Sequence, residues 1–317
     1  MRQVTPLSLT MAFSLQLSVV LWSVSFTTAQ WCYQGQYSCN ATCSDPSVWF
    51  TLFPNCGGDR QSPINIVTSK VRHDPALTEL HFQGYHEAHD VTVENMGHSA
   101  HFTLPPTLRL SGGQLPDTYK ALQFHLHWGT DASPGSEHTL DGERFPMELH
   151  IVHIKERYST LEEAENDTSG IALLAFFFEE SAEDNTHFAV VAEGLGRVRY
   201  TGNSSTVRAV RLGDIMPATE ELHRYYRYRG SMTTPSCDQA VVWTLFHRTI
   251  PVSRRQLVTV SRELVFWTGK PMADNFRPAQ WLNGRSVFRS TADPVLPSAA
   301  AAWLCVLAVL GLHWNVH

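Results

Sequence analysis

The chain has 317 residues, of which 43% are hydrophobic and 17% charged, so it can bury a large core and does not have the composition of a disordered protein. The formal net charge is -6, and no basic stripe is interleaved with aromatic residues, which argues against nucleic acid as a partner. There is no internal repeat, low-complexity linker or shift in composition, so we expect one domain.

Residues 1–29 have the pattern of a secretory signal peptide. Arg2 supplies a positive charge, an apolar run extends from about residue 11 to residue 24, and the small residues Thr27 and Ala29 follow it. We place the cleavage site after Ala29. A membrane anchor is the alternative, but the apolar run is short and no stop-transfer charges follow.

Short runs rich in strand-forming residues dominate the rest of the chain, and turn residues separate them. The runs are HDVTVENM (89–96), HFTLP (101–105), ALQFHLHWG (121–129), MELHIVHI (147–154), GIALLAFFF (170–178), HFAVVAEGL (187–195), QAVVWTLFH (239–247) and ELVFWTG (263–269). Only STLEEAEN (159–166) and TEELHRYYRY (219–228) are expected to be helical or turn-like. This pattern predicts one β-dominated domain with a large sheet.

Histidines interrupt two of these apolar runs, and the strand period of two sorts them by face. In the first run, Leu122, Phe124, Leu126 and Trp128 share one face, and Gln123, His125 and His127 share the other. In the second, Met147, Leu149 and Ile151 share one face, and Glu148, His150 and Val152 the other. The turn-rich segment 129–146 allows an antiparallel return, so two neighbouring strands can bring three imidazoles to one point.

Three neutral imidazoles suit Zn(II) with an open fourth position, as in catalytic zinc sites. Gln123 and Glu148 each lie two residues before a histidine on the same face, where they can accept the second N–H of an imidazole. Without a partner, Glu148 would be a costly carboxylate in an apolar strand. A lone H-x-H is more often a core or surface pair, and cupin-type sites also use it. The added E-x-H on the next strand favours a metal site.

The C-terminal residues 291–317 have the pattern of a GPI-anchor signal. The apolar run at 299–312 is shorter than the roughly 20 residues of a spanning helix, and no Lys or Arg follows it. Ser290, followed by two small residues, is the predicted attachment residue; Ser286 and Ala292 stay open. A spanning helix with almost no cytoplasmic tail is the alternative. The mature domain is therefore predicted at 30–290.

Cysteines and sequons agree with a secretory route. The mature region has five cysteines, so at most two disulfides can form within it: Cys32, Cys39, Cys43, Cys56 and Cys237. Three N-x-S/T sequons are predicted glycosylation sites: Asn40, Asn166 and Asn203.

Seven motifs along nearly all of the mature chain resemble those of the alpha-class carbonic anhydrases. They are DRQSPINIV (59–67), NMGHSAHF (95–102), QFHLHWG (123–129), GSEHTLDG (135–142), MELHIVH (147–153), GSMTTPS (230–236) and DNFRPAQ (274–280). The two terminal signals and the early cysteines look most like the GPI-anchored extracellular isozymes, of the four and fifteen type. The resemblance implies a β-dominated α+β fold: a single domain around a large twisted, mostly antiparallel central sheet with short peripheral helices.

The resemblance also implies roles for individual residues. His125, His127 and His150 would bind Zn²⁺, while Gln123, Glu148 and the backbone near Asn275 would orient these imidazoles. Thr233 would accept the hydrogen of a zinc-bound hydroxide and donate its own to Glu137, and Thr234 would line the polar side. His98 would shuttle protons, because an imidazole titrates near neutrality, and Tyr33 would help order the proton-carrying waters. The alternative for His98 is an ordinary exposed histidine.

The implied reaction is the reversible hydration of carbon dioxide to bicarbonate and a proton, by attack of zinc-bound hydroxide, at the outer cell surface. The apolar wall for CO₂ would consist of Val152, Ile171, Leu173, Met232 and Trp243. Leu173 replaces a more common valine and Met232 a leucine, so the added bulk bears on the rate and on larger substrates such as esters. The expected partners are CO₂/bicarbonate and, through the GPI anchor, the membrane; the protein is expected to be a monomer.

The resemblance pairs Cys56 with Cys237, and Cys32 with Cys43 as the second bridge, leaving Cys39. Ser236 stands where the family often has a second proline. Two other function classes remain: a catalytically silent binding protein on the same fold, which loss of a zinc histidine would favour, and a cupin-like iron oxygenase, in which GSEHT and SMTTPS would have no role.

Overall fold

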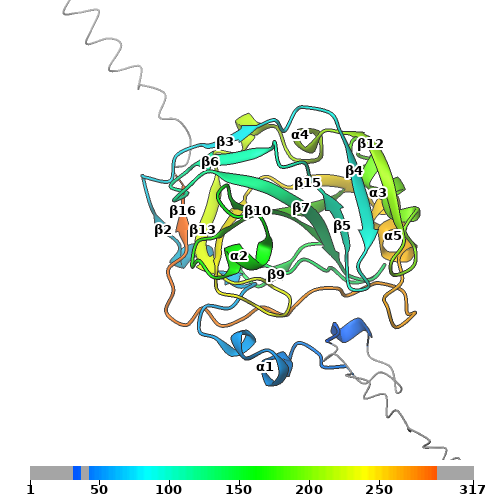
Figure 1. Ribbon diagram of the computed structural model, residues 1–317, viewed down its shortest axis with the longest axis horizontal. Helices are drawn as coiled ribbons and strands as arrows, with labels where there is room; N and C mark the ends of the chain where they lie inside the picture. The colour runs from blue at the N-terminus through cyan, green and yellow to red at the C-terminus, as the bar shows by residue number, and fades with distance from the viewer. Residues whose placement is uncertain (1–30, 37–42, 291–317) are drawn as a thin grey trace, which may run out of the picture.

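The computed structural model describes residues 31–36 and 43–290. A large mixed sheet runs through the domain and the short helices lie around it (Figure 1), which confirms the predicted fold class. The α-helices are α1 (Trp49–Leu52), α2 (Leu161–Glu165), α3 (Ala189–Gly196), α4 (Leu212–Ile215) and α5 (Arg254–Glu263). The 3-10 helices are η1 (Gln34–Gln36), η2 (Pro54–Gly57), η3 (Thr68–Lys70) and η4 (Thr219–Glu221). Of the helices in this part of the chain, none is both long and apolar enough to cross a bilayer.

Sixteen strands are described. They are β1 (Asn65–Ile66), β2 (Arg72–His73), β3 (Leu80–Gln83), β4 (His89–Asn95), β5 (Ala100–Thr103), β6 (Arg109–Gly112), β7 (Tyr119–Trp128), β8 (Thr139–Leu140), β9 (Glu143–Arg144), β10 (Met147–Lys155), β11 (Ile171–Ser181), β12 (Ser204–Val210), β13 (Tyr225–Gly230), β14 (Val241–Phe246), β15 (Ile250–Ser253) and β16 (Phe288–Arg289). The large sheet has the main order β12-β4-β5-β7-β10-β11-β14-β13-β16-β2. Most of its pairs are antiparallel, but β11 is parallel to β14 and β15, and β16 is parallel to β2.

The central strands separate two parts of the hydrophobic core. Phe124, Leu126 and Ile151 belong to one cluster, whereas Val152 and Trp243 belong to the other. This alternation follows from the strand period of two. His125, His127 and His150 stand on the same side as Val152, at the centre of the sheet, where both backbones are fixed by neighbouring strands.

One residue departs from the predicted alternation. Leu122 was expected to share a face with Phe124, but it packs against the cluster of Val152 and Trp243. The register between β7 and β10 shifts at Val152/His153, where Gln123 and Ala121 are the successive partners on β7. Leu122 is therefore the extra residue of a β-bulge, and such a residue breaks the regular alternation of faces.

The predicted helices and strands were wrong in three places. Residues 187–195 were expected as a strand but form most of α3, because Phe188, Val191 and Leu195 are buried at helical spacing. Residues 263–269 were expected as a strand, but they follow the end of α5 and make only an isolated bridge. Residues 219–228 were expected to be helical or turn-like, but only 219–221 form a helix, η4, and 225–228 belong to strand β13. Helix α2 was predicted correctly.

Candidate metal centre and active site

Strands β7 and β10 bring three histidines together. His125 lies directly opposite His150 in the antiparallel register, and His127 lies opposite Glu148. All three imidazoles are buried, with ring centroids 4.6–5.3 Å apart. One nitrogen from each ring lies within 4.8 Å of the others, so the three could hold one metal ion. The predicted convergence of the two strands is confirmed.

Each imidazole is fixed by a hydrogen bond through the nitrogen that points away from this centre. The pairs are His125 Nδ1 with Gln123 Oε1 at 2.9 Å, His127 Nδ1 with the Asn275 carbonyl oxygen at 2.7 Å, and His150 Nε2 with Glu148 Oε1 at 2.7 Å. The structure thus places all three predicted orienting groups next to their histidines. Because these oxygens accept, the ring nitrogens facing them carry the hydrogens, and the opposite nitrogens have free lone pairs.

The donor set fits a cation. His127 Nε2 and His150 Nδ1 lie 3.1 Å apart, and both carry lone pairs once their other nitrogens donate. Two lone pairs facing each other in a buried site repel unless a positive charge lies between them. Neutral imidazoles are also the form that binds metals, and burial lowers the pKa of His125 and His127 below the usual histidine value.

Glu148 connects the centre to a buried chain of polar side chains. Besides His150, it accepts hydrogen bonds from the backbone N–H and Nδ1 of His138, at 2.8 and 2.7 Å. His138 Nε2 is hydrogen-bonded to the Tyr228 hydroxyl at 2.7 Å, and that hydroxyl to Ser62 Oγ at 2.8 Å. Burial alone would raise the pKa of Glu148, but the charges and hydrogen bonds of His138 and His150 outweigh it, so this pKa lies well below its usual value.

Sequence reasoning missed this chain beyond Glu148. His138, Tyr228 and Ser62 were given no role. All of them are buried. One signal was available: a carboxylate in an apolar strand needs polar partners, and the segment between β7 and β10 contains one histidine, His138.

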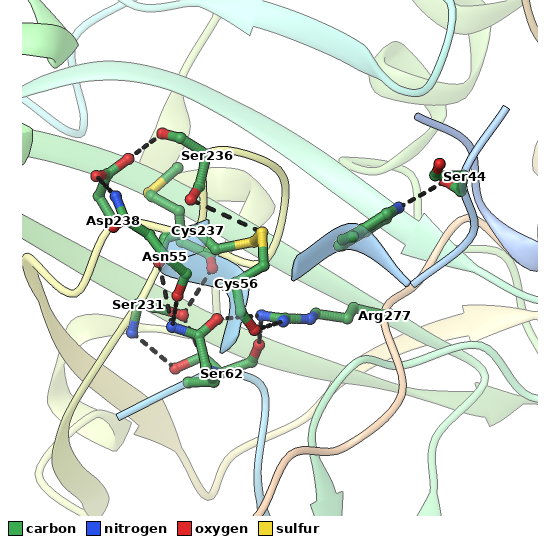
Figure 2. Close-up of a disulfide and its surroundings, with 12 residues drawn as sticks. Ser44, Asn55, Cys56, Ser62, Ser231, Ser236, Cys237, Asp238 and Arg277 are labelled. Carbon is green, nitrogen blue, oxygen red and sulfur yellow. Dashed lines mark hydrogen bonds between the residues drawn. A yellow bond between two sulfur atoms is a disulfide. The ribbon is translucent and has the colours of Figure 1, made fainter. Parts of the chain in front are cut away.

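The residues that begin the turn after β13 are held from two sides (Figure 2). Ser231 donates its backbone N–H to Ser62 Oγ at 3.0 Å, and its carbonyl oxygen accepts from Trp243 Nε1 at 3.0 Å. At the other end of the turn, the disulfide between Cys56 and Cys237 ties it to η2. Thr233, between these supports, is buried, and Thr234 is half-buried.

The predicted hydrogen bond between Glu137 and Thr233 is not formed. Glu137 Oε1 accepts the backbone N–H of Arg277 at 2.7 Å, whereas Oε2 has no hydrogen-bond partner. Instead, Oε2 lies 3.5 Å from His127 Nε2 and 3.9 Å from His150 Nδ1. The carboxylate therefore faces the ligand nitrogens, which adds a negative charge beside the centre.

Four of the five residues predicted to form an apolar wall belong to one buried cluster, and the fifth, Met232, is half-buried against it. Val152 on β10 lies opposite Leu173 on β11, and Leu173 lies opposite Trp243 on β14, so these three side chains are neighbours across adjacent strands. Ile171 is two residues before Leu173 on β11. The Trp243 ring lies 4.9 Å from that of His150, which places the apolar cluster against a predicted metal ligand.

His98 and Tyr33 are enclosed by the N-terminal segment. The His98 ring stacks on Trp31 with centroids 3.7 Å apart, and its Nε2 lies 2.8 Å from the Trp31 carbonyl oxygen and 3.0 Å from Trp267 Nε1. One nitrogen cannot donate to the first and accept from the second together, so each bond requires its own tautomer. Burial lowers the pKa of His98. The Tyr33 hydroxyl is buried without a hydrogen-bond partner, and burial raises its pKa.

The remaining predicted residues are placed as follows. Both predicted disulfides, Cys32–Cys43 and Cys56–Cys237, are present. Asn166 at the end of α2 and Asn203 before β12 are exposed. Ser290 is buried beside β13. Cys39, Asn40, the predicted signal peptide and the predicted C-terminal signal lie outside the described residues.

The chain that forms this fold and site belongs to a known family of enzymes. Residues 44–291 match the eukaryotic-type carbonic anhydrase family, so the chain is a member of it. It is an enzyme, a carbonate dehydratase, whose substrates are carbon dioxide and bicarbonate. Carbonic anhydrase 4 of Oryctolagus cuniculus is 42% identical over 288 residues, covering 88% of this chain and 92% of the relative. Carbonic anhydrase 4 of Rattus norvegicus is 38% identical, covering 92% and 96%, and carbonic anhydrase 15 of Mus musculus is 36% identical, covering 90% and 91%.

Proposed function

We propose that His125, His127 and His150 bind zinc, and that this zinc centre carries out CO₂ hydration on the outer cell surface. The observation that carries the zinc proposal is the pair of facing lone pairs on His127 and His150, because they need a cation between them. Three nitrogen ligands that leave one position open suit a catalytic zinc. A catalytically silent protein on the same fold would have no need to keep all three ligands and their acceptors.

Zinc held in this way lowers the pKa of water to about 7 and so supplies a nucleophile at neutral pH, a chemistry for which carbonic anhydrase is itself the standard example. The protein supplies the surroundings. Val152, Leu173 and Trp243 offer CO₂ an apolar surface beside His150. Thr233 and Thr234 offer hydroxyl groups that orient the nucleophile. Ile171 and Met232 extend the apolar wall.

Protons leave the centre through His98 in this proposal, and Tyr33 helps to order the waters that carry them. In the position described, the His98 ring stacks on Trp31. Its Nε2 is engaged by Trp31 and Trp267, so proton exchange at this nitrogen requires those two contacts to break. The enclosed hydroxyl of Tyr33, which has no protein partner, is available to a water molecule.

The zinc proposal is tested by stopped-flow measurement of CO₂ hydration on the purified protein, with and without a chelator. We expect hydration that is lost when the metal is removed and restored by added zinc. A matched variant, His127→Ala, should lose both zinc and activity. Hydration that survives complete removal of the metal, or folded protein that never hydrates CO₂ when zinc is present, would contradict the proposal.

The proposed location rests on the chain's terminal sequences. We propose a signal peptide at 1–29, a catalytic domain at 30–290 and a GPI-anchor signal at 291–317, with Ser290 as the attachment residue. Two disulfides support passage through an oxidising compartment. The exposed Asn166 and Asn203 are accessible to glycosylation, and Asn40 is a third proposed site. We propose a monomer in this setting.

Phosphatidylinositol-specific phospholipase C tests the anchor on intact expressing cells. We expect the enzyme activity to move from the cell surface into the medium, because this lipase cuts the lipid from a GPI anchor. A chain ending at residue 290 serves as the control, since it should be secreted without treatment. Activity that stays on the cells after complete digestion would favour a spanning helix.

A further inference from the structure

A cavity away from the proposed zinc site, here called the arginine cavity, opens on the part of the sheet formed by β13, β14 and β16. Strands β13 and β16 are labelled in Figure 1. Its volume is about 420 Å³, within the range of sites for small organic ligands. Four guanidinium groups line it, those of Arg60, Arg227, Arg229 and Arg285, and Asp74 is the one carboxylate among its lining residues. None of these residues is part of the proposed catalytic site.

Arg227 is the unusual member of this group. Arg227 is only 7% exposed, although its side chain carries a positive charge. Its Nε donates to Thr244 Oγ1 at 3.1 Å and its Nη1 to the Gly113 carbonyl oxygen at 2.7 Å, but Nη2 has no hydrogen-bond partner. Burial lowers its pKa only to about 10, so the group stays charged at neutral pH. Nη2 is also covered by protein atoms, so Arg227 contributes its positive charge to the cavity wall but no hydrogen bond to a ligand.

The other arginines add charge that is not neutralised within the cavity. Arg285 bonds to the carbonyl oxygens of Arg229 and Gln61, at 3.1 and 2.7 Å, which fixes its position, and the charge of Asp59 acts on it as well as on Arg60. Arg229 is exposed and its Nη1 lies 3.3 Å from the Thr168 carbonyl oxygen. Arg60 has an ion pair with Asp59 at 3.9 Å, a long separation for an exposed pair. A dianion matches this excess of positive charge better than a monoanion does.

The lining is not only polar. Leu77 and Val242 are buried, and Phe288 is half-buried, so they give the cavity an apolar side. We propose that this cavity binds a small organic phosphate monoester, with the phosphate on Arg229 and Arg60 and the organic group against Leu77, Val242 and Phe288. The proposal does not depend on the zinc centre.

Phenyl phosphate is a suitable probe, because it joins a dianionic phosphate to an apolar ring. Isothermal titration of the zinc-loaded, full-length protein should show saturable binding, and benzoate, a monoanion with the same ring, should bind more weakly. The variant Arg229→Gln should weaken the binding of phenyl phosphate about tenfold, and Arg60→Gln/Arg229→Gln should weaken it further. Arg229 is exposed and the Arg60 side chain is 40% exposed, so these variants keep the fold, whereas removal of Arg227 disturbs Gly113 and Thr244.

The matched control is Arg208→Gln, an exposed arginine on β12 at the opposite end of the sheet path, which should leave binding unchanged. CO₂ hydration should be the same in all three variants. Absence of saturable binding would overturn the proposal. Equal binding by the wild type and Arg229→Gln would overturn it too, because a phosphate bound to the metal would give that result. Equal affinity for benzoate would also overturn it. Vesicles of phosphatidylcholine with phosphatidic acid separate the two sources of the group: binding to these vesicles without binding of phenyl phosphate would refute a soluble ester.

Discussion

Glu148 shows at the scale of one residue what a sequence pattern can and cannot reveal. Its position two residues before His150 follows from the strand period, and the predicted hydrogen bond is present. Its second partner, His138, comes from a loop, and no periodic pattern links a loop residue to a strand. The same limit applies to Asn275, whose carbonyl oxygen reaches His127 from a segment almost 150 residues away.

The variant His98→Ala tests the proposed proton path. We expect slower CO₂ hydration in weak buffer, because no imidazole then accepts the proton at this position, and recovery when imidazole is added to the solution. His187→Ala, which removes an exposed histidine away from the site, is the control and should behave like the wild type. A slowed variant that added imidazole does not restore would show that the proton leaves by another path.

At the scale of elements, the long central strands were predictable and most of the helices were not. β7 and β10 are apolar runs in which polar residues recur at a period of two, β11 begins with a continuous apolar run, and each of the three is held on both sides by other strands. In α3, the residues Ala189–Val191 resemble a strand in composition, and they form a helix because of how they pack in the folded protein. Helix α5 begins with a capping box between Ser253 and Gln256, a local signal that could have been found in the sequence.

The two disulfides should contribute differently to stability and activity. Cys56–Cys237 closes a loop with a sequence separation of 181, and Cys32–Cys43 one of 11. Loop-closure entropy gives about 5 and about 3 kcal/mol for loops of these lengths. Urea unfolding of Cys56→Ser/Cys237→Ser should show the larger loss, and its CO₂ hydration should be slower, because the turn with Thr233 loses one support. Cys32→Ser/Cys43→Ser is the matched control. Equal loss of CO₂ hydration in both variants would contradict the proposed support of the Thr233 turn by Cys56–Cys237.

At the scale of the whole molecule, buried histidines make the stability depend on pH. His153 is fully buried, hydrogen-bonded to the Tyr85 hydroxyl, and burial lowers its pKa to about 4. Below about pH 6.5 the unfolded chain binds a proton at this histidine that the folded chain does not, so the free energy of unfolding falls as the pH drops toward 4. The full effect of one such group is on the order of 3 kcal/mol.

Urea unfolding at several pH values between about 7 and 4.5 checks this effect. In His153→Gln the decline of the unfolding free energy with falling pH should be shallower than in the wild type, whatever the stability of the variant at neutral pH. His73→Gln, at an exposed position on β2, should leave the slope unchanged. An unchanged slope in His153→Gln would show that His153 is not protonated differently in the two states.

The arrangement of the whole sheet was beyond the sequence patterns. They indicated a large sheet, but not that β14 would lie parallel to β11 or that β16 and β2 would extend it beyond β13. The arginine cavity depends on this order, since Arg60, Asp74 and Arg285 come from distant segments that meet only around β13 and β14. A single sequence gives the faces of strands, whereas the order of strands depends on packing between faces far apart in the chain.

The hydrogen bonds of Ser290, the last described residue, have a mechanical consequence. Ser290 N–H donates to the Tyr225 carbonyl oxygen at 3.0 Å, and its hydroxyl accepts from the Tyr225 N–H at 2.9 Å and donates to the His223 carbonyl oxygen at 2.7 Å. Any tension on the following residues therefore enters β13 at its first residue. That strand runs directly into the turn with Thr233. If the chain is anchored at this end, a pulling force on the anchor would act on the strand that positions the threonines of the proposed active site.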